Sequence, residues 1–167
     1  MMDAVAVALP DRMLEPVRRW ALRELKVHPR QVVVVVGCRS PWILPVLRDL
    51  VAEGGAVLVF EPDPERRRRA EAEIDSHGWS NVAVVAQGPG DMELPRRADR
   101  VLLDDDWALA AGADVERLVA LLGPSGRIAA ICRRGCPACA HLQETLAHPR
   151  RESFYRGGAY ALWGQLP

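Results

Sequence analysis

The sequence predicts an α/β fold, in which helices cover both faces of a doubly wound, mostly parallel sheet of seven strands that ends in an antiparallel hairpin. Three observations predict this fold. Short runs rich in β-branched residues alternate with stretches of helical periodicity, turn residues separate them, and two extended segments at the end of the chain flank a Gly-Gly turn. The 167 residues suffice for one domain, so we expect a single domain over 1–167, with a helical region at 1–29 and the α/β core at 30–167.

The expected elements follow one another in a regular order. Apolar residues recur at helical spacing between residues 12 and 26, which predicts an opening helix with Asp11 as its cap. Residues 31–36 contain five consecutive valines, as is typical of a strand buried on both faces of its sheet. Further strands are expected at 56–60, 81–86, 100–103 and 127–131, the hairpin strands at 151–155 and 159–166, and further helices at 44–52, 64–77, 115–122 and 138–146.

The charge of the chain limits its partners. Its 22 basic and 22 acidic residues cancel, so it lacks the global electrostatic footprint of proteins that bind nucleic acids or membrane surfaces. The longest apolar runs are of strand length, and residues 1–12 lack the basic leader and apolar core of a secretory signal. We therefore expect a cytoplasmic protein that acts on a small-molecule substrate, without nucleic-acid or membrane partners.

Three of the four cysteines, Cys132, Cys136 and Cys139, lie in one short segment. This clustering favours reduced thiols or a metal site over the disulfide framework of a secreted protein. Two functional interpretations remain open: a redox pair of Cys136 and Cys139 at the start of a helix, and a zinc site completed by His141. Ordinary buried or surface thiols are the simpler interpretation and the one that we expect, together with no metal site.

Four local sequences carry a resemblance to a known family. They are Val-Val-Gly-Cys-Arg-Ser-Pro at 35–41, Val-Leu-Val-Phe-Glu-Pro-Asp-Pro-Glu at 57–65, Gly-Trp-Ser-Asn-Val at 78–82 and Leu-Gly-Pro-Ser-Gly-Arg at 122–127. Together with the order of elements from residue 14 to residue 166, they resemble the class I S-adenosylmethionine-dependent methyltransferases, most closely those of ubiquinone and menaquinone biosynthesis. The resemblance implies a Rossmann-like fold and S-adenosylmethionine as the cofactor.

The resemblance also implies where the cofactor would bind. The acid that ends the second strand in this family bonds the ribose hydroxyls, and Glu61 occupies that position, where a carboxylate can accept two hydrogen bonds from a diol. Gly37, Cys38 and Arg39 would line the amino-acid end of the cofactor, and Asp91 would lie near its adenine amine. The sequence lacks a Gly-x-Gly-x-x-Gly motif after the first strand, which argues against a dinucleotide cofactor.

The loop after the first strand departs from the family pattern. The family usually reads Asp-Val-Gly-Cys-Gly-Thr-Gly there, whereas this chain has Val35 in place of the acid, and Arg39 and Pro41 in place of two glycines. A glycine that passes close to a ligand cannot be replaced by a long side chain or by a residue of fixed φ without a change in the loop. The glycine-rich cofactor motif is therefore degenerate.

An acidic run follows the fourth strand, at the edge where open α/β sheets bind their ligands. It consists of Asp104, Asp105 and Asp106, and Trp107 comes next. We assign Asp104 and Trp107 to the catalytic region, where a carboxylate could orient or deprotonate a substrate. Two of these acids could instead hold a divalent cation, or they could be solvated acids of which one caps the next turn.

Two hypotheses of function follow. The first is transfer of the methyl group of S-adenosylmethionine to a small molecule, by in-line displacement at the sulfonium carbon, with the protein mainly positioning the reactants. The second is a non-methylating protein of this fold that serves as a binding or assembly module, or that catalyses another reaction in the old cofactor pocket. Arg39 and Pro41 favour the second hypothesis. The chain has little beyond its core to cover a substrate, so a homodimer that completes the pocket is a further expectation.

Overall fold

The computed structural model describes residues 10–88, 91, 94, 96–104, 112–133, 135–155 and 159–167. The helices in these residues are α1 (Asp11–Leu25), α2 (Ile43–Val51), α3 (Pro64–His77), α4 (Gly112–Ala120) and α5 (Pro137–Thr145). The strands are β1 (Val32–Val36), β2 (Ala56–Phe60), β3 (Val82–Val85), β4 (Ala98–Leu103), β5 (Leu122–Arg133), β6 (Ala147–Phe154) and β7 (Ala159–Gln165). None of these helices combines the length and the apolar character needed to cross a bilayer.

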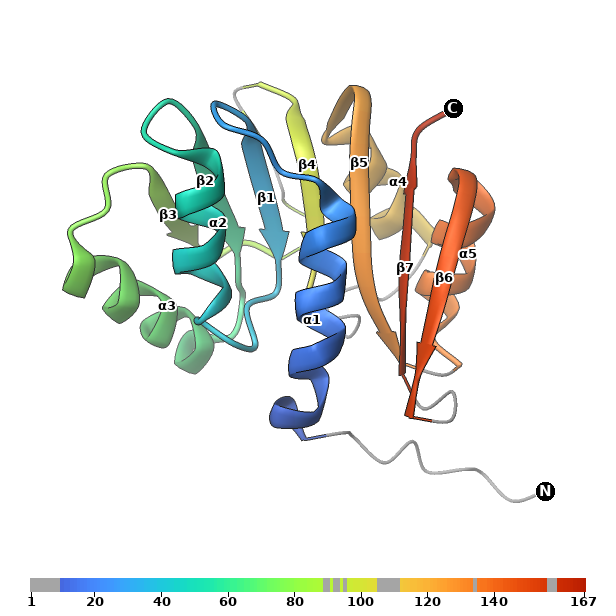
Figure 1. Ribbon diagram of the computed structural model, residues 1–167, viewed down its shortest axis with the longest axis horizontal. Coiled ribbons are helices and arrows are strands. Elements are labelled where there is room, and N and C mark those ends of the chain that lie inside the picture. The colour runs from blue at the N-terminus through green and yellow to red at the C-terminus, as the bar shows by residue number, and fades with distance from the viewer. Residues whose placement is uncertain are drawn as a thin grey trace.

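The seven strands form one sheet in the order β3-β2-β1-β4-β5-β7-β6. Every neighbouring pair from β3 to β5 is parallel, whereas β7 is antiparallel to both β5 and β6. Helices α1, α2 and α3 cover one face of the sheet, and α4 and α5 cover the other (Figure 1). The prediction of a doubly wound, mostly parallel seven-stranded sheet with an antiparallel end is therefore confirmed.

β1 lies between β2 and β4 and is buried on both faces. Val33 and Val35 pack into the core on the side of α1 and α2, while Val34 and Val36 pack into the core on the side of α4 and α5. Successive side chains of a strand point to opposite faces, so a strand that is covered on both sides needs an apolar residue at every position. The run of valines meets this requirement.

Several local predictions differ from the structure. The first hairpin strand begins at residue 147 rather than 151, and residue 122 belongs to β5 rather than to the helix predicted at 115–122. Pro10 is the N-cap of α1 and makes no side-chain hydrogen bond there, so the cap predicted at Asp11 is wrong. Asp11 lies instead in the first turn of α1, where the helix dipole favours an acid. The Gly-Pro-Ser-Gly stretch at 123–126, which precedes the strand predicted at 127–131, lies inside β5, and the pairing of β5 with β4 is interrupted there, between residues 122 and 127.

Candidate functional site

The carboxyl ends of β1, β2 and β4 meet at one edge of the sheet, which we call the strand-end edge. The last residues of these strands are partners in the sheet register: Val36, Phe60 and Leu103. Gly37, Glu61 and Asp104 follow them directly, so the three loops begin at the same level of the sheet. Open α/β sheets bind their ligands at this edge.

Glu61 is only 1% exposed, although it follows the last residue of β2. Its Oε2 accepts a hydrogen bond from the backbone N–H of Cys38 at 2.7 Å, and its Oε1 accepts one from the N–H of Asp63 at 2.9 Å. Hydrogen bonds to an ionised carboxylate are shorter and stronger than those between neutral groups. Glu61 therefore joins the loop after β1 to the loop after β2.

Asp104 is as deeply buried, at 1% exposure. Its Oδ1 accepts a hydrogen bond from Nε of Arg18 at 2.6 Å, and its Oδ2 accepts one from the backbone N–H of Arg39 at 2.9 Å. A buried carboxylate needs such partners because the removal of a charge from water is costly. Asp104 thereby connects β4 to α1 and to the loop after β1.

Two arginines converge on Asp11 at the start of α1. Nη1 of Arg18 donates to the carbonyl oxygen of Asp11 at 3.0 Å, and its Nη2 lies 3.5 Å from Oδ1 of Asp11. Nε of Arg39 lies 3.0 Å from the same carboxylate oxygen. Arg18 is fully buried, whereas the side chain of Asp11 is 48% exposed. Among the described residues, neither Nη2 of Arg18 nor Nε of Arg39 has a well-directed hydrogen bond, so both donors are underused.

The buried position of Arg18 and the pairing role of Asp11 were not predicted from the sequence. A signal is present, because Arg18 lies four residues after Leu14 and four before Leu22, on the apolar stripe of α1. A charged side chain on such a stripe needs a buried partner of opposite charge. The helix pattern does not show that the partner is Asp104, which is 86 residues away in the chain. We call Asp11, Arg18, Arg39, Glu61 and Asp104 the loop network.

The thiol of Cys38 lies among these charges. Its side chain is fully buried. Burial raises the pKa of the Cys38 thiol well above its ordinary value, and the negative charges of Asp104 and Glu61 raise it further. Because the thiolate is the form that reacts and that binds metals, Cys38 acts as a packing residue of the loop after β1.

Three further residues were predicted for the site: Gly37, Asp91 and Trp107. Gly37 has a φ of 71°, in the left-handed region that favours glycine, and its N–H donates to the last carbonyl of β2 at 2.9 Å. Asp91 is exposed, beyond the end of β3. Trp107, together with residues 105 and 106, lies outside the described residues.

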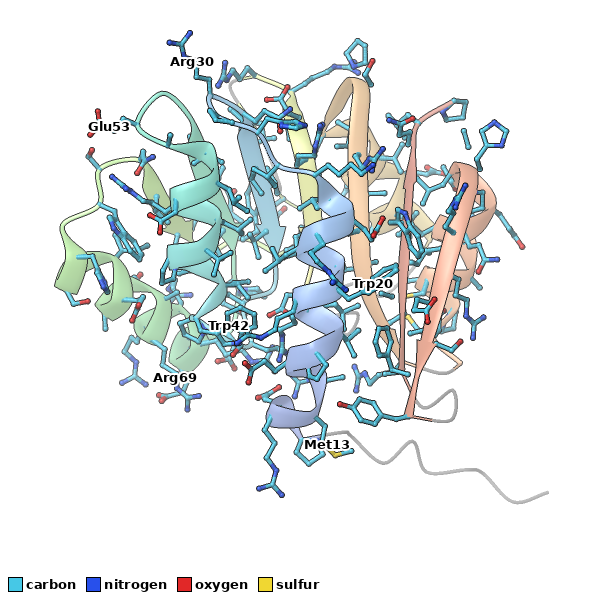
Figure 2. All side chains as sticks on the ribbon, in the orientation of Figure 1. Met13, Trp20, Arg30, Trp42, Glu53 and Arg69 are labelled. Carbon is cyan, nitrogen blue, oxygen red and sulfur yellow. A yellow bond between two sulfur atoms is a disulfide. The ribbon has the colours of Figure 1, made fainter. Side chains whose placement is uncertain are left out.

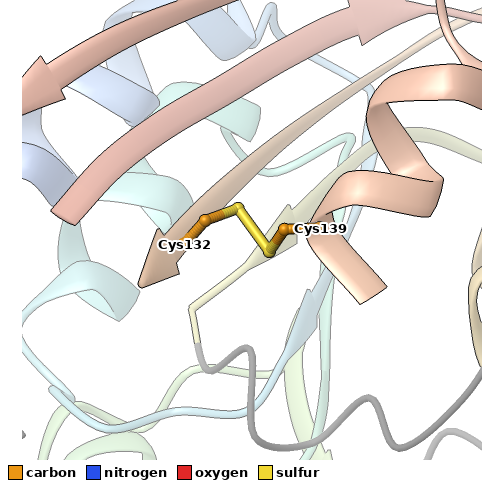
Figure 3. Close-up of a disulfide and its surroundings, with 2 residues drawn as sticks. All are labelled: Cys132 and Cys139. Carbon is orange, nitrogen blue, oxygen red and sulfur yellow. A yellow bond between two sulfur atoms is a disulfide. The ribbon is translucent and has the colours of Figure 1, made fainter. Parts of the chain in front are cut away.

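The cysteine cluster contains a disulfide. Cys132 in β5 is bonded to Cys139 on α5, and their Cα atoms are 6.2 Å apart (Figure 3). The expectation of reduced thiols is therefore wrong for these two cysteines, because α5 packs back on the strand that precedes it. The bonded pair is also not the Cys136–Cys139 pair that the spacing suggested. Within the part of the chain that the structure describes, no group of three or more His, Cys, Asp or Glu side chains could hold a metal ion.

A groove of about 690 Å³ lies between α1 and α2, on the outer surface of the helical layer. Both basic and apolar residues of α1 and of the two positions after it line one side, and apolar residues of α2 and its N-cap line the other: Pro16, Arg19, Leu22, Arg23, Lys26, Val27, Trp42, Val46 and Leu50. Figure 2 labels Trp42 beside α2, and the guanidinium of Arg19 lies 5.1 Å from the centre of the Trp42 ring. No residue of the loop network lines this groove. The groove is therefore separate from the strand-end edge.

Of the comparisons with known proteins, the one with solved structures bears on the fold. No protein-family profile matches the sequence, and no curated protein matches it. Solved structures do match. The N-methyltransferase NodS from Bradyrhizobium japonicum WM9 is 15% identical with a TM-score of 0.75, and the match covers 95% of this chain and 99% of that one. An S-adenosylmethionine-dependent methyltransferase from Aquifex aeolicus is 19% identical with a TM-score of 0.71, over 95% of this chain and 94% of that one.

A third structure, an S-adenosylmethionine-dependent O-methyltransferase from Thermotoga maritima, is 16% identical with a TM-score of 0.72. The match covers 96% of this chain and 66% of that one. At such identities a likeness establishes the fold and not the chemistry. The chain therefore has the class I methyltransferase fold.

Proposed function

We propose that this chain binds S-adenosylmethionine at the strand-end edge and transfers its methyl group to a small molecule. The observation that supports the proposal is the position of Glu61, a carboxylate that directly follows β2 and bonds to the loop after β1 in a sheet of the methyltransferase fold. An acid at this position of an α/β sheet suits the ribose hydroxyls of an adenosyl ligand. The resemblance of the local sequences to enzymes of ubiquinone and menaquinone biosynthesis supports a small organic acceptor.

The polar groups at the edge fit both ends of such a cofactor. A carboxylate offers about four lone-pair positions, and the N–H groups of Cys38 and Asp63 use two of those on Glu61. Acceptor capacity therefore remains for hydroxyl groups, although Glu61 has to become more accessible to use it. The guanidinium of Arg39, which now pairs with the half-exposed carboxylate of Asp11, suits a carboxylate such as that of the methionyl group once it exchanges partners.

The residues of the chain would bind and orient the two reactants. S-adenosylmethionine, when bound, supplies an electrophilic methyl group. Glu61 would hold the ribose, Gly37 would let the loop approach the ligand because it has no side chain, and Arg39 would bond the ligand carboxylate. Asp104 positions Arg39 through its backbone N–H, and Trp107 would form a wall of the transfer region. Such positioning can lower the barrier of a two-reactant step considerably.

One observation favours a second function, that of a non-methylating binding or assembly module. The N–H groups of Cys38 and Arg39, which a cofactor would approach, already donate to Glu61 and Asp104. Pro41 restricts the same loop because its φ is fixed. In this second proposal the loop network is a structural unit, and the fold presents its outer surface to a partner.

Calorimetric titration with S-adenosylmethionine and S-adenosylhomocysteine decides between the two proposals. Methyl transfer predicts saturable binding of both ligands, which the Arg39→Gly variant keeps or weakens moderately. Arg69→Gly, on the exposed side of α3, serves as the control that leaves binding unchanged. The absence of binding by the native protein at about 1 mM ligand, which corresponds to about 4 kcal/mol, would exclude the methyltransferase proposal. Binding that is recovered in an Arg39→Gly, Pro41→Gly double variant would identify a site that these two side chains close.

A further inference from the structure

Three cysteines meet where β5 passes into α5. Cys132 and Cys139 are joined to each other, and both are fully buried. Cys136 lies in the connection between them, outside the disulfide, and is partly exposed. A buried disulfide and a thiol within reach of solvent therefore share one short segment.

Cys136 and Cys139 both lie at the start of α5. Cys136 is the N-cap residue of α5, and Cys139 is the third residue of that helix. The N-cap and the third residue of a helix are neighbours on its first turn, close enough for the side chain of each to reach the backbone of the other in a capping box. The N-terminal end of a helix stabilises negative charge, which favours the thiolate that attacks disulfides.

We propose that these three cysteines form a thiol–disulfide exchange site, in which Cys136 gives external dithiols access to the buried Cys132–Cys139 disulfide. The Cys136 thiol loses its proton to solvent, and the thiolate attacks Sγ of Cys139. A Cys136–Cys139 bond forms and the Cys132–Cys139 bond breaks. Cys132 leaves as a thiolate and takes up a proton because its surroundings are apolar. The exchange involves no net oxidation or reduction.

The exchange moves the disulfide toward solvent, where a dithiol can reduce it. One thiolate of the dithiol attacks Sγ of Cys136 and releases Cys139 as a thiol. The second thiolate of the dithiol attacks the resulting mixed disulfide, releases Cys136 and closes a cyclic disulfide in the reagent. The dithiol is oxidised, the protein disulfide is reduced, and the two protons of the dithiol end on the cysteines. β5 and α5 are then no longer covalently joined.

Peptide mapping during reduction tests the first step. The protein is treated with dithiothreitol, quenched with acid at intervals, and alkylated with N-ethylmaleimide. Trypsin cleaves after Arg133 and Arg134, so Cys132 leaves on a different peptide from Cys136 and Cys139. The Cys132–Cys139 disulfide therefore joins two peptides, whereas the exchanged disulfide closes a loop within one. We expect the exchanged product before reduction is complete, and its absence at every interval would overturn the proposal.

The rate of reduction tests the role of Cys136. In a Cys136→Ser variant the dithiol has to reach buried sulfur atoms directly, so we expect reduction to be slower by on the order of tenfold, since exchange rates depend on access. Cys38→Ser is the matched control, because it removes the other cysteine outside the disulfide and leaves the β5–α5 connection intact. It should be reduced at the rate of the native protein. Equal rates for Cys136→Ser and the native protein would overturn the proposal.

Dependence on urea separates exchange from unfolding. A buried disulfide can also be reduced when its surroundings open, and such openings become more frequent in urea because they expose surface. We expect the reduction rate of the native protein to change little at low urea, and that of Cys136→Ser to rise steeply. A steep dependence in both proteins would show that Cys136 provides no separate route.

Discussion

The loop after β1 and the connection after β5 are held by different chemistry, although both follow buried strands of one sheet. Charged hydrogen bonds to Glu61 and Asp104 hold the first, and a covalent bond between Cys132 and Cys139 holds the second. The charged contacts depend on the exclusion of water, whereas the disulfide depends on the redox state. The two regions should therefore fail under different conditions, and each can be broken without the other.

The largest effect is expected when the buried ion pair is broken. An Arg18→Leu variant leaves Asp104 buried without its charged partner, and we expect the free energy of unfolding to fall by about 3–5 kcal/mol. Urea denaturation followed by circular dichroism measures this loss. Adding reductant should leave the difference between variant and native protein unchanged, because the disulfide lies in the other region.

Two further variants control this experiment. Arg19→Leu removes a side chain that is 66% exposed and pairs with Glu15, so we expect it to change the free energy of unfolding by less than about 1 kcal/mol. An Arg18→Leu, Asp104→Asn double variant removes both charges and keeps an acceptor for the N–H of Arg39, so it should recover part of the loss. A loss for Arg18→Leu no larger than for Arg19→Leu would contradict the role given to the buried pair.

The second effect tests the covalent side of the comparison. The disulfide closes a short loop, with a sequence separation of 7, so a Cys132→Ala, Cys139→Ala variant should lose about 2–3 kcal/mol of the free energy of unfolding. The native protein should lose a similar amount when it is reduced, while the variant should not respond to reductant. Urea denaturation with and without dithiothreitol gives both values. A variant as stable as the oxidised native protein would mean that the disulfide contributes nothing to stability.

The third effect concerns ligand affinity. Glu61→Gln keeps the size of the side chain but turns one acceptor oxygen into an NH₂ group that faces an N–H donor. If the cofactor proposal holds, S-adenosylhomocysteine should bind more weakly by about 1.5–3 kcal/mol, as expected for a hydrogen bond to a charged group. Calorimetry measures this in protein whose circular dichroism matches the native protein, with Glu65→Gln on the surface of α3 as the control. Unchanged affinity would remove Glu61 from the site.

The smallest effect comes from an exposed charged contact. Asp63 is the N-cap of α3, and its carboxylate accepts a hydrogen bond from the backbone N–H of Arg66. This hydrogen bond, together with the positive charges of Arg66 and Arg69, holds the pKa of Asp63 below its usual value. A carboxyl whose pKa is lower in the folded state than in the unfolded state stabilises the fold at pH values above its unfolded pKa of about 3.9. This stabilisation is lost as the pH falls below that value.

An Asp63→Asn variant keeps the cap but does not titrate. The difference in Tm between this variant and the native protein should be constant near neutral pH and should change to the disadvantage of the native protein below about pH 4. Scanning calorimetry over the acid range measures it. A constant difference over the whole range would show that Asp63 makes no titratable contribution.

The fold could be predicted because its signals are local. The run of valines in β1 and the helical spacing of apolar residues in α1 are patterns within short stretches of sequence. Similar patterns recur along the chain. The placement of Glu61 and Asp104 at one edge follows from the same patterns, because parallel strands end at the same edge. The pairing of Arg18 with Asp104 could not be predicted, since it joins elements 86 residues apart. The choice of Cys139 rather than Cys136 as the partner of Cys132 depends on how α5 packs against β5, which cysteine spacing does not encode.

The order of strands places β3 and β6 at the two rims of the sheet. β3 has only 4 residues, and the exposed stretch of β6 contains Pro149, Arg150, Arg151 and Glu152. Proline cannot donate a hydrogen bond to a neighbouring strand, and charged side chains on a rim oppose the addition of another chain. Both rims therefore protect the protein against edge-to-edge aggregation at high concentration. A homodimer of the kind expected from the sequence would have to use a different surface.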